Sequence, residues 1–288
     1  MSEPLTDVFE YLEGWHQPGG EAWREENRQY LRDHLRRFAV TLDALPPAPS
    51  PQTALLELGA TPYYLTLLAA KYRGYQVHAA TAYAPHAPRS GRVRLAHPAR
   101  GEFVVPFEAF NVELDPFPYP DQRFDAVLCC ELLEHLNLDP TWMLLEIHRI
   151  LKPNGRLLLT TPNVLALRNY VAMLRRQNIY MHYSGYGIYG RHNREWTLSE
   201  VHSLLDALGY TVDVATTVDT YPHPLKDRIL KRLLPHTRDM ILLVARRTGV
   251  ATAAYPPALY GSWDKRAMQY NPRNPIPSRS QTCEDATR

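Results

Sequence analysis

Apolar residues along the middle of the chain follow two alternating patterns. Short, nearly continuous apolar runs predict buried β-strands at 53–58, 75–80, 102–107, 124–130, 156–162, 211–218 and 239–247. Apolar residues at helical spacing predict helices at 62–73, 140–151, 198–208 and 224–234. Strands that alternate with helices indicate an α/β fold with a doubly wound, mostly parallel sheet.

Polar and proline residues mark where several of these helices begin. Pro62 is expected at the first position of its helix, and Asp139 is expected to cap the helix that starts at Pro140. Thr197 and Glu200 predict a capping box, in which each side chain accepts a hydrogen bond from the other residue's backbone N–H.

The two ends of the chain differ from its middle. Residues 21–45 predict one amphipathic helix, and the Pro-rich segment 46–51 a stiff linker, so that 1–51 form an N-terminal helical extension. Residues 82–101, rich in Pro, Arg and His, are predicted as a loop. Beyond Gly249 the polar, Pro-rich composition predicts an irregular, flexible tail at 250–288. Residues 52–249 are then one domain.

Composition narrows the class of protein. With 288 residues, of which 45% are hydrophobic, the chain can bury a sizeable core, and a net charge of +2 gives no general attraction to polyanions. No apolar run approaches the roughly 18 residues of a membrane span, and the N-terminus lacks an apolar signal core. Three cysteines do not make a disulfide framework. These features predict a cytoplasmic protein without a membrane span.

The doubly wound sheet predicts where a ligand binds, because such sheets bind ligands at the carboxyl ends of their strands. This rule brings together the turn 59–63, the residues after Ala80 and those after Phe110, and the corner from Cys130 to His135.

The corner after the fourth strand carries side chains suited to catalysis. In "ELLEHL", Glu131, Glu134 and His135 stand at i, i+3 and i+4, so a helical turn would bring all three to one point. Two carboxylates and an imidazole suit Mg²⁺ or Mn²⁺ and, less selectively, Zn²⁺ or Fe²⁺. His192, in "GRHNREWT", is a fourth candidate ligand.

Two other interpretations of the same residues stay open. His135 or His192 could act as a general base without a metal. The glutamates could instead cap helices or pair with arginines such as Arg149.

Residues 110–163 are similar to a known family. "FNVELDPFPYPDQRFDAVLCCELLEHL" (110–136) and "EIHRILKPNGRLLLTTPN" (146–163) resemble the class I S-adenosylmethionine-dependent methyltransferases, in their type 11/23-like group. The resemblance covers roughly residues 53–246. It implies a Rossmann-like methyltransferase fold with seven strands, the last two antiparallel, and S-adenosyl-L-methionine as the cofactor.

The resemblance also implies a set of cofactor-binding residues. The family's first motif resembles E-x-G-x-G-x-G, and here Thr61 and Tyr63 replace two of its glycines. Thr81 stands where the family usually supplies a carboxylate to the cofactor's ribose. We expect these side chains to reshape the pocket, so that cofactor binding is weaker or another acid such as Glu113 compensates. The residues implied are Glu57, Gly59, Ala60, Thr61, Thr81, Asn111, Val112, Glu113 and Cys130.

The E-x-x-E-H element resembles that of two subgroups, the ubiquinone-pathway O-methyltransferases and the small-RNA terminal 2′-O-methyltransferases. The second subgroup also shares "TTPN" and "H-x-x-E-W-T". By resemblance, Glu131, Glu134, His135 and His192 would hold a metal that binds two neighbouring hydroxyls, with Glu131, His135 and His192 as catalytic residues. A bound cation lowers the pKa of a hydroxyl and orients a diol.

An aromatic segment within the insert 164–195 suggests the acceptor. Tyrosines recur every third residue at 180, 183, 186 and 189, with glycines among them that disfavour a regular helix. Because tyrosines stack on sugar rings, the segment predicts a lid over a small-molecule or glycan acceptor, although a packed cap without a ligand is an alternative. The segment also resembles uncharacterised methyltransferases associated with polysaccharide-type biosynthesis.

The leading hypothesis is therefore an O-methyltransferase for a sugar-containing or related acceptor, and two rivals remain. RNA ribose methylation would use the basic stretches at 89–100 and 226–232, but most charge runs are solvated faces. A non-catalytic, methyltransferase-like binding protein would explain the missing glycines. A nucleotide-dependent oxidoreductase fits the 110–163 motifs poorly.

Overall fold

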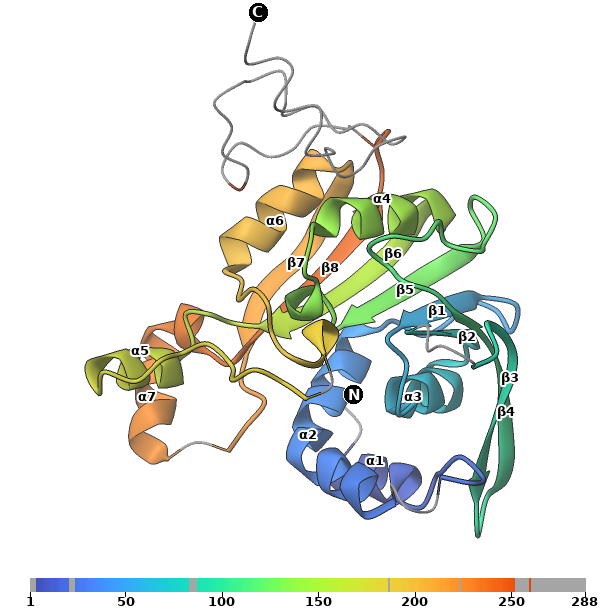
Figure 1. Ribbon diagram of the computed structural model, residues 1–288, viewed down its shortest axis with the longest axis horizontal. Helices are drawn as coiled ribbons and strands as arrows, with labels where there is room; N and C mark the ends of the chain where they lie inside the picture. Colours follow the sequence, from blue (N-terminus) through green and yellow to red (C-terminus); the bar gives the residue numbers. More distant parts are fainter. Residues whose placement is uncertain are drawn as a thin grey trace, which may run out of the picture.

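The computed structural model describes residues 4–20, 24–82, 87–185, 187–222, 224–251 and 259. They form an eight-stranded sheet in the order β3-β4-β2-β1-β5-β6-β8-β7, with helices on both of its faces (Figure 1). The predicted α/β, mostly parallel architecture is confirmed.

The strands are β1 (Ala54–Leu58), β2 (Gln76–Thr81), β3 (Ser90–His97), β4 (Gly101–Ala109), β5 (Phe124–Cys130), β6 (Leu151–Pro162), β7 (Tyr210–Val218) and β8 (Met240–Arg247). The α-helices are α1 (Leu5–Leu12), α2 (Arg24–Ala44), α3 (Tyr64–Arg73), α4 (Pro140–Ile150), α5 (Leu167–Leu174), α6 (Leu198–Ala207) and α7 (Leu225–Leu233). Short 3₁₀ helices are η2 (Leu133–His135), η3 (Ile188–Gly190) and η4 (Pro235–Thr237).

The strand order reverses beside β1. β1 pairs in parallel with β2 on one side and with β5 on the other, β4 and β6 continue the parallel sheet, and β8 runs antiparallel between β6 and β7. The crevice of a doubly wound sheet lies at such a reversal, outside the carboxyl ends of the strands. The fold therefore directs attention to the residues after β1 and β5.

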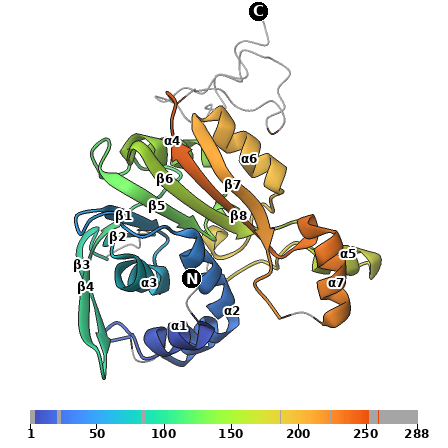
Figure 2. The same cartoon turned by 180° about the vertical axis from the view of Figure 1, so that it is seen from behind.

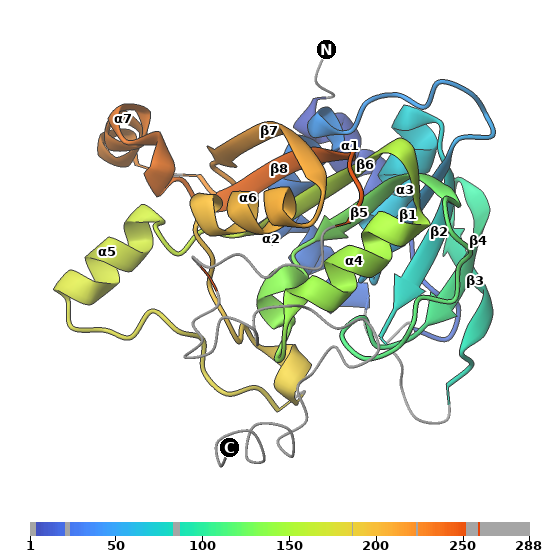
Figure 3. The same ribbon diagram turned by 90° about the horizontal axis from the view of Figure 1, so that it is seen from above.

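Alternate residues of the strands pack into two apolar cores, one on each face of the sheet. Leu55 and Leu128 join the core beneath α1, α2 and α3, whereas Leu56 and Leu157 join the core beneath α4 and α6. The views from behind and from above show these two helix layers with the sheet between them (Figures 2 and 3).

The prediction of a loop over 82–101 is wrong for the residues of β3, and the expected count of seven strands is one too few. β3 pairs antiparallel with β4 along the edge of the sheet. Arg92 and Arg94 are exposed while Leu95 is buried, so β3 is a half-exposed strand with charged residues on its outer face. Such strands lack the continuous apolar run that marks a buried one.

Helix boundaries agree with the sequence in two places and differ in a third. Asp139 caps α4 by accepting a hydrogen bond from the Thr141 N–H, and the Thr197–Glu200 capping box is present at α6. α3 begins at Tyr64 rather than Pro62, because Tyr63 takes a left-handed backbone conformation (φ 73°) that cannot continue a helix.

Further differences from the expected elements lie near the ends of the chain and in the insert. Helices α1 and α5 were not expected, and β6 begins at Leu151 rather than at residue 156. The start of the predicted helix 21–45 and nearly all of the predicted tail 250–288 lie outside the described residues. Among the helices described, none is long and apolar enough to cross a membrane.

Candidate functional site

A cavity of about 210 Å³ lies at the carboxyl ends of β1 and β5, where the strand order reverses. Residues from β1, the turn after it, the corner after β5, and helices α2 and α3 line it. They are Tyr30, Arg37, Phe38, Thr41, Glu57, Gly59, Ala60, Thr61, Pro62, Tyr64, Leu65, Cys130, Glu131 and His135. Five of the expected cofactor residues are thus brought together, namely Glu57, Gly59, Ala60, Thr61 and Cys130.

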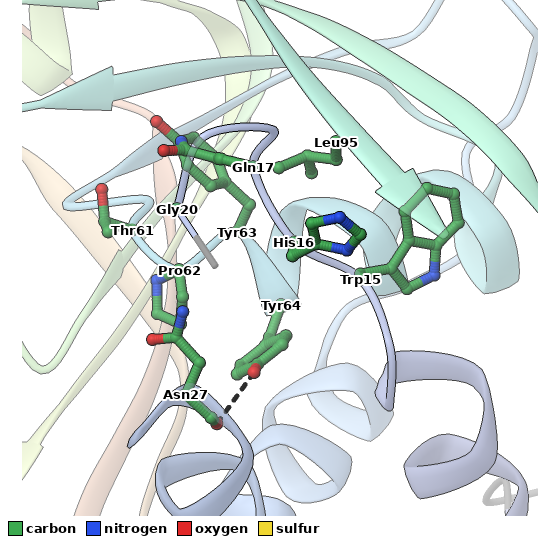
Figure 4. A pocket seen from close by; sticks show the side chains of 10 residues that line it. All are labelled: Trp15, His16, Gln17, Gly20, Asn27, Thr61, Pro62, Tyr63, Tyr64 and Leu95. Carbon is green, nitrogen blue, oxygen red and sulfur yellow. Dashed lines mark hydrogen bonds between the residues drawn. The ribbon is translucent and has the colours of Figure 1, made fainter. Parts of the chain in front are cut away.

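The glycine-poor turn leaves this cavity open. Gly59 has a φ of +69°, a left-handed conformation that glycine adopts without strain. Tyr63 is buried and lines a neighbouring cavity (Figure 4), and it is not among the residues that line the cavity at the strand ends. Trp15, His16 and the other residues drawn in Figure 4 line that second cavity. Replacing a motif glycine with Tyr63 therefore does not fill the cavity at the strand ends.

Glu57 is a buried acid in the wall of the cavity. Its carboxyl group accepts a hydrogen bond from the Thr66 hydroxyl, on α3. Burial raises the pKa of Glu57 from 4.5 to about 8. Near neutral pH, Glu57 is therefore mainly protonated.

An ion pair between distant parts of the chain closes one side of the cavity. The Arg37 guanidinium, on α2, lies 3.1 Å from a carboxylate oxygen of Glu131. The other oxygen of Glu131 accepts a hydrogen bond from the Thr160 hydroxyl at 3.0 Å. Glu131 has a φ of 52°, so it does not continue into the 3₁₀ turn of η2. The expected helical turn that would join Glu131 to Glu134 and His135 is therefore absent at Glu131.

Glu134, His135 and His192 form a compact group, with one potential ligand atom of each lying within 4.8 Å of the others. η2 supplies the first two, and the loop before α6 supplies His192. The two imidazole rings meet edge to face with their centroids 5.1 Å apart. Glu131 lies outside this group.

Hydrogen bonds direct the lone pairs of these three side chains toward one another. His135 Nδ1 lies 3.0 Å from the Arg191 carbonyl oxygen, and His192 Nδ1 lies 2.8 Å from a Glu195 carboxylate oxygen. Since both Nδ1 atoms must then carry the proton, each Nε2 atom is left as an acceptor. Glu134 accepts from the Thr161 hydroxyl with one oxygen, and its buried Oε1 has no hydrogen-bond partner among the described residues.

Such a group of potential ligand atoms suits a cation. His135 Nε2 and Glu134 Oε1 are 3.9 Å apart, too far for a hydrogen bond. Burial, and then the nearby Glu131, raise the pKa of Glu134 well above its usual range, so this carboxyl group holds a proton that a bound cation would displace. Burial and the neighbouring His192 lower the pKa of His135, which favours the neutral ring that binds metals.

The remaining expected cofactor residues do not reach the cavity. Among the described residues, Thr81, Asn111, Val112 and Glu113 lie outside its lining. Glu113 is buried, and its Oε1 atom accepts a hydrogen bond from the Leu138 N–H at 2.6 Å. Val112 packs against the core beneath α4 and α6.

One hydrogen bond joins the aromatic segment to an expected cofactor residue. The Tyr189 hydroxyl accepts a hydrogen bond from the Asn111 side-chain amide at 3.0 Å. Tyr180 and Tyr183 are exposed, and the Arg191 guanidinium lies 4.5 Å from the centroid of the Tyr183 ring. Residue 186 lies outside the described residues.

Several side chains have partners other than those considered from the sequence. Arg149 pairs with Glu146 and Asp121, not with the glutamates after β5. Lys231, in the second basic stretch, is buried between Asp219 and Asp239, so it is not presented to phosphate groups.

Sequence reasoning missed the contribution of α2 and of Glu195. Tyr30, Arg37, Phe38 and Thr41 reach the cavity only because α2 packs across the strand ends. No local pattern marks Arg37, which looks like one of several surface arginines of an amphipathic helix. Glu195 does carry a signal, because it stands three residues after His192.

A family model described as a methyltransferase domain matches residues 23–214, more than half of the chain. The chain belongs to this methyltransferase family. The expectation of a class I S-adenosylmethionine-dependent methyltransferase is thereby confirmed, and the matched region includes α2.

Individual relatives of this methyltransferase are distant or partial. Ubiquinone biosynthesis O-methyltransferase of Xanthomonas oryzae pv. oryzae is 38% identical over 77 residues, which are 27% of this chain and 31% of that protein. The chain thus spans about a third of the length of the curated relatives it matches. A structure of the Haloferax volcanii complex between the Trm112 methyltransferase activator and a putative methyltransferase aligns with a TM-score of 0.54 and 15% identity. That alignment covers 79% of this chain and 96% of the other, and it shows a shared fold.

Proposed function

We propose that this methyltransferase transfers a methyl group from S-adenosylmethionine to a hydroxyl of a sugar-containing or related small-molecule acceptor. We further propose that a divalent cation is held by Glu134, His135 and His192. One observation carries the proposal, namely the convergence of three potential metal-ligand atoms beside the cavity at the strand ends.

The cavity fits the amino-acid end of the methyl donor. That end carries a carboxylate and an ammonium group, and the paired Arg37 and Glu131 offer one charge of each sign on the same side of the cavity. The left-handed Gly59 turn and the small side chain of Ala60 leave the backbone accessible beside them. The donor's sulfonium activates its methyl group toward attack by a hydroxyl oxygen.

The donor set at the cation site indicates which metals it prefers. Two imidazole nitrogens and one carboxylate oxygen suit Mn²⁺, Fe²⁺ or Zn²⁺ better than Mg²⁺, which prefers oxygen ligands. Glu195 holds His192 by its Nδ1–H, and the Arg191 carbonyl holds His135 in the same way, so both rings are oriented before an ion binds. A cation there lowers the pKa of an acceptor hydroxyl and orients a neighbouring one.

Two observations support an oxygen acceptor on a polar ring. The partial relative is named as an O-methyltransferase, which supports oxygen as the atom that is methylated. Tyr180 and Tyr183 expose aromatic surface in the segment that leads to the site, and such rings stack on sugars.

The cation is tested by titrating the purified protein with Mn²⁺ and following the free ion by electron paramagnetic resonance. We expect one site per chain, which His135→Ala and His192→Ala each remove. His202→Ala, an exposed histidine on α6, is the matched control and should bind as the wild type does.

The reaction is tested by adding donor with a labelled methyl group to panels of free sugars, vicinal-diol phenols and short RNAs. Label on a sugar or phenol hydroxyl that is lost in excess chelator supports both proposals. Label that persists in chelator would remove the cation and leave His135 or His192 as a general base. Label on RNA alone would replace the acceptor class.

A further inference from the structure

Helix α7 packs with its polar side inward. Lys231 is only 2% exposed, and its ammonium group lies 2.9 Å from carboxylate oxygens of Asp219 and Asp239. On the outward side, Ile229 is 56% exposed and Leu233 73% exposed. A surface helix normally buries its apolar side, so this arrangement presents apolar surface to whatever lies outside the protein.

Helix α5 repeats this arrangement from a neighbouring strand. It follows β6 as α7 follows β7, and both helices project beyond the same end of the sheet (Figures 1 and 3). Met173 is 50% exposed and Leu174 85% exposed. Both helices form an ion pair with the same carboxylate, because Arg168 of α5 and Lys231 of α7 both pair with Asp239. We call the exposed residues of this pair within 170–176 and 228–234 the α5–α7 surface.

Basic residues border the apolar ones on this surface. Arg228 and Arg232 are exposed one helical turn apart on α7, and Arg175 and Arg176 are exposed just after α5. The half-buried acid Asp227 lies on the inward side of α7, near Lys231 in the helical projection. Exposed leucines bordered by arginines on short amphipathic helices are typical of segments that lie in the interface of an anionic membrane.

We propose that the α5–α7 surface docks this protein on an anionic membrane surface. The leucines, isoleucine and methionine enter the boundary between headgroups and acyl chains, and the four arginines face the anionic headgroups. A second copy of the chain is a poorer occupant, because like-charged arginines would then face one another. RNA is a poorer occupant too, since it offers nothing to cover the apolar side chains.

Docking in this way would bring the candidate active site to the membrane. The α5–α7 surface follows the carboxyl ends of β6 and β7, and the hydroxyls of Thr160 and Thr161, near the end of β6, hold Glu131 and Glu134. An acceptor anchored in the bilayer could then reach the site without leaving the membrane. The docking proposal itself does not depend on the reaction.

The test is sedimentation of the full-length protein with vesicles of phosphatidylcholine, alone or with a third of phosphatidylglycerol. We expect binding to the anionic vesicles that weakens with added salt and is slight with neutral vesicles. Ile229→Glu with Leu233→Glu should lower the partition coefficient by roughly a hundredfold, about tenfold for each side chain. Arg228→Gln with Arg232→Gln should lower it by roughly thirtyfold.

The control is Val104→Glu on β4, which adds one glutamate at an exposed apolar position near the edge of the sheet opposite β7. It should bind vesicles as the wild type does, and circular dichroism should show all variants folded. Absence of wild-type sedimentation with anionic vesicles would overturn the proposal. A wild-type dimer that Leu233→Glu converts to a monomer, without vesicle binding, would assign the surface to a second copy instead. Methyl donor is absent throughout, so failure here leaves the proposed reaction untouched.

Discussion

The buried acid Glu57 gives a sharp test of the packing around the cavity. In the folded protein, burial holds its pKa at about 8, whereas the unfolded chain releases the proton near pH 4.5. The stability that comes from the neutral carboxyl is therefore fully present below pH 4.5 and is lost as the pH rises to about 8. Between pH 5 and pH 9 this amounts to about 4 kcal/mol of unfolding free energy.

Glu57→Gln removes this dependence because the amide is neutral at every pH. Urea denaturation at pH 5 and at pH 9 should show that the wild type loses about 4 kcal/mol more than the variant over this range. Glu102→Gln, at an exposed position on β4, should behave as the wild type does. Equal pH dependence in the wild type and in Glu57→Gln would mean that the folded protein holds an ionised Glu57, and the reasoning from burial would fail.

Three further predictions concern other parts of the molecule. Glu195→Ala should weaken Mn²⁺ binding roughly tenfold to a hundredfold, as measured by calorimetry, because His192 loses the carboxylate that orients it. Lys231→Met should lower the free energy of unfolding by about 3–5 kcal/mol in urea denaturation, because two acids are left without their buried cation. Tyr63→Gly should lower the free energy of unfolding by about 2 kcal/mol or more, because a buried ring is lost. The affinity for S-adenosylhomocysteine should stay within threefold, because the ring lies outside the cavity at the strand ends. A large gain in affinity would contradict this placement of the ring.

Much of the fold follows from local patterns in the sequence. β1, β5 and β6 lie between two apolar cores, and their continuous apolar runs show this directly. β3 was not predicted, because its apolar residues Val93 and Leu95 alternate with exposed arginines in a segment rich in proline. α5 was not predicted either, and most of its large apolar side chains are exposed rather than packed in a core.

The candidate site was foreseeable in part. The spacing of "ELLEHL" located Glu134 and His135, and His192 was found by its motif. The position of Glu131 could not be foreseen, since a left-handed backbone is uncommon for a residue other than glycine and changes where the side chain points. The contribution of Arg37 depends on how α2 packs, and tertiary packing of this kind leaves no mark in local spacing.

Because α2 supplies one wall of the cavity at the strand ends, truncations and hybrid proteins that lose α2 change this cavity. A fragment cut at the linker before β1 would retain the glycine turn and every family motif. It would nevertheless lack Tyr30, Arg37, Phe38 and Thr41, and so would leave the proposed donor site open on one flank. Hybrids that exchange only the first fifty residues should accordingly alter how tightly the donor is held while leaving the strand-end motifs intact.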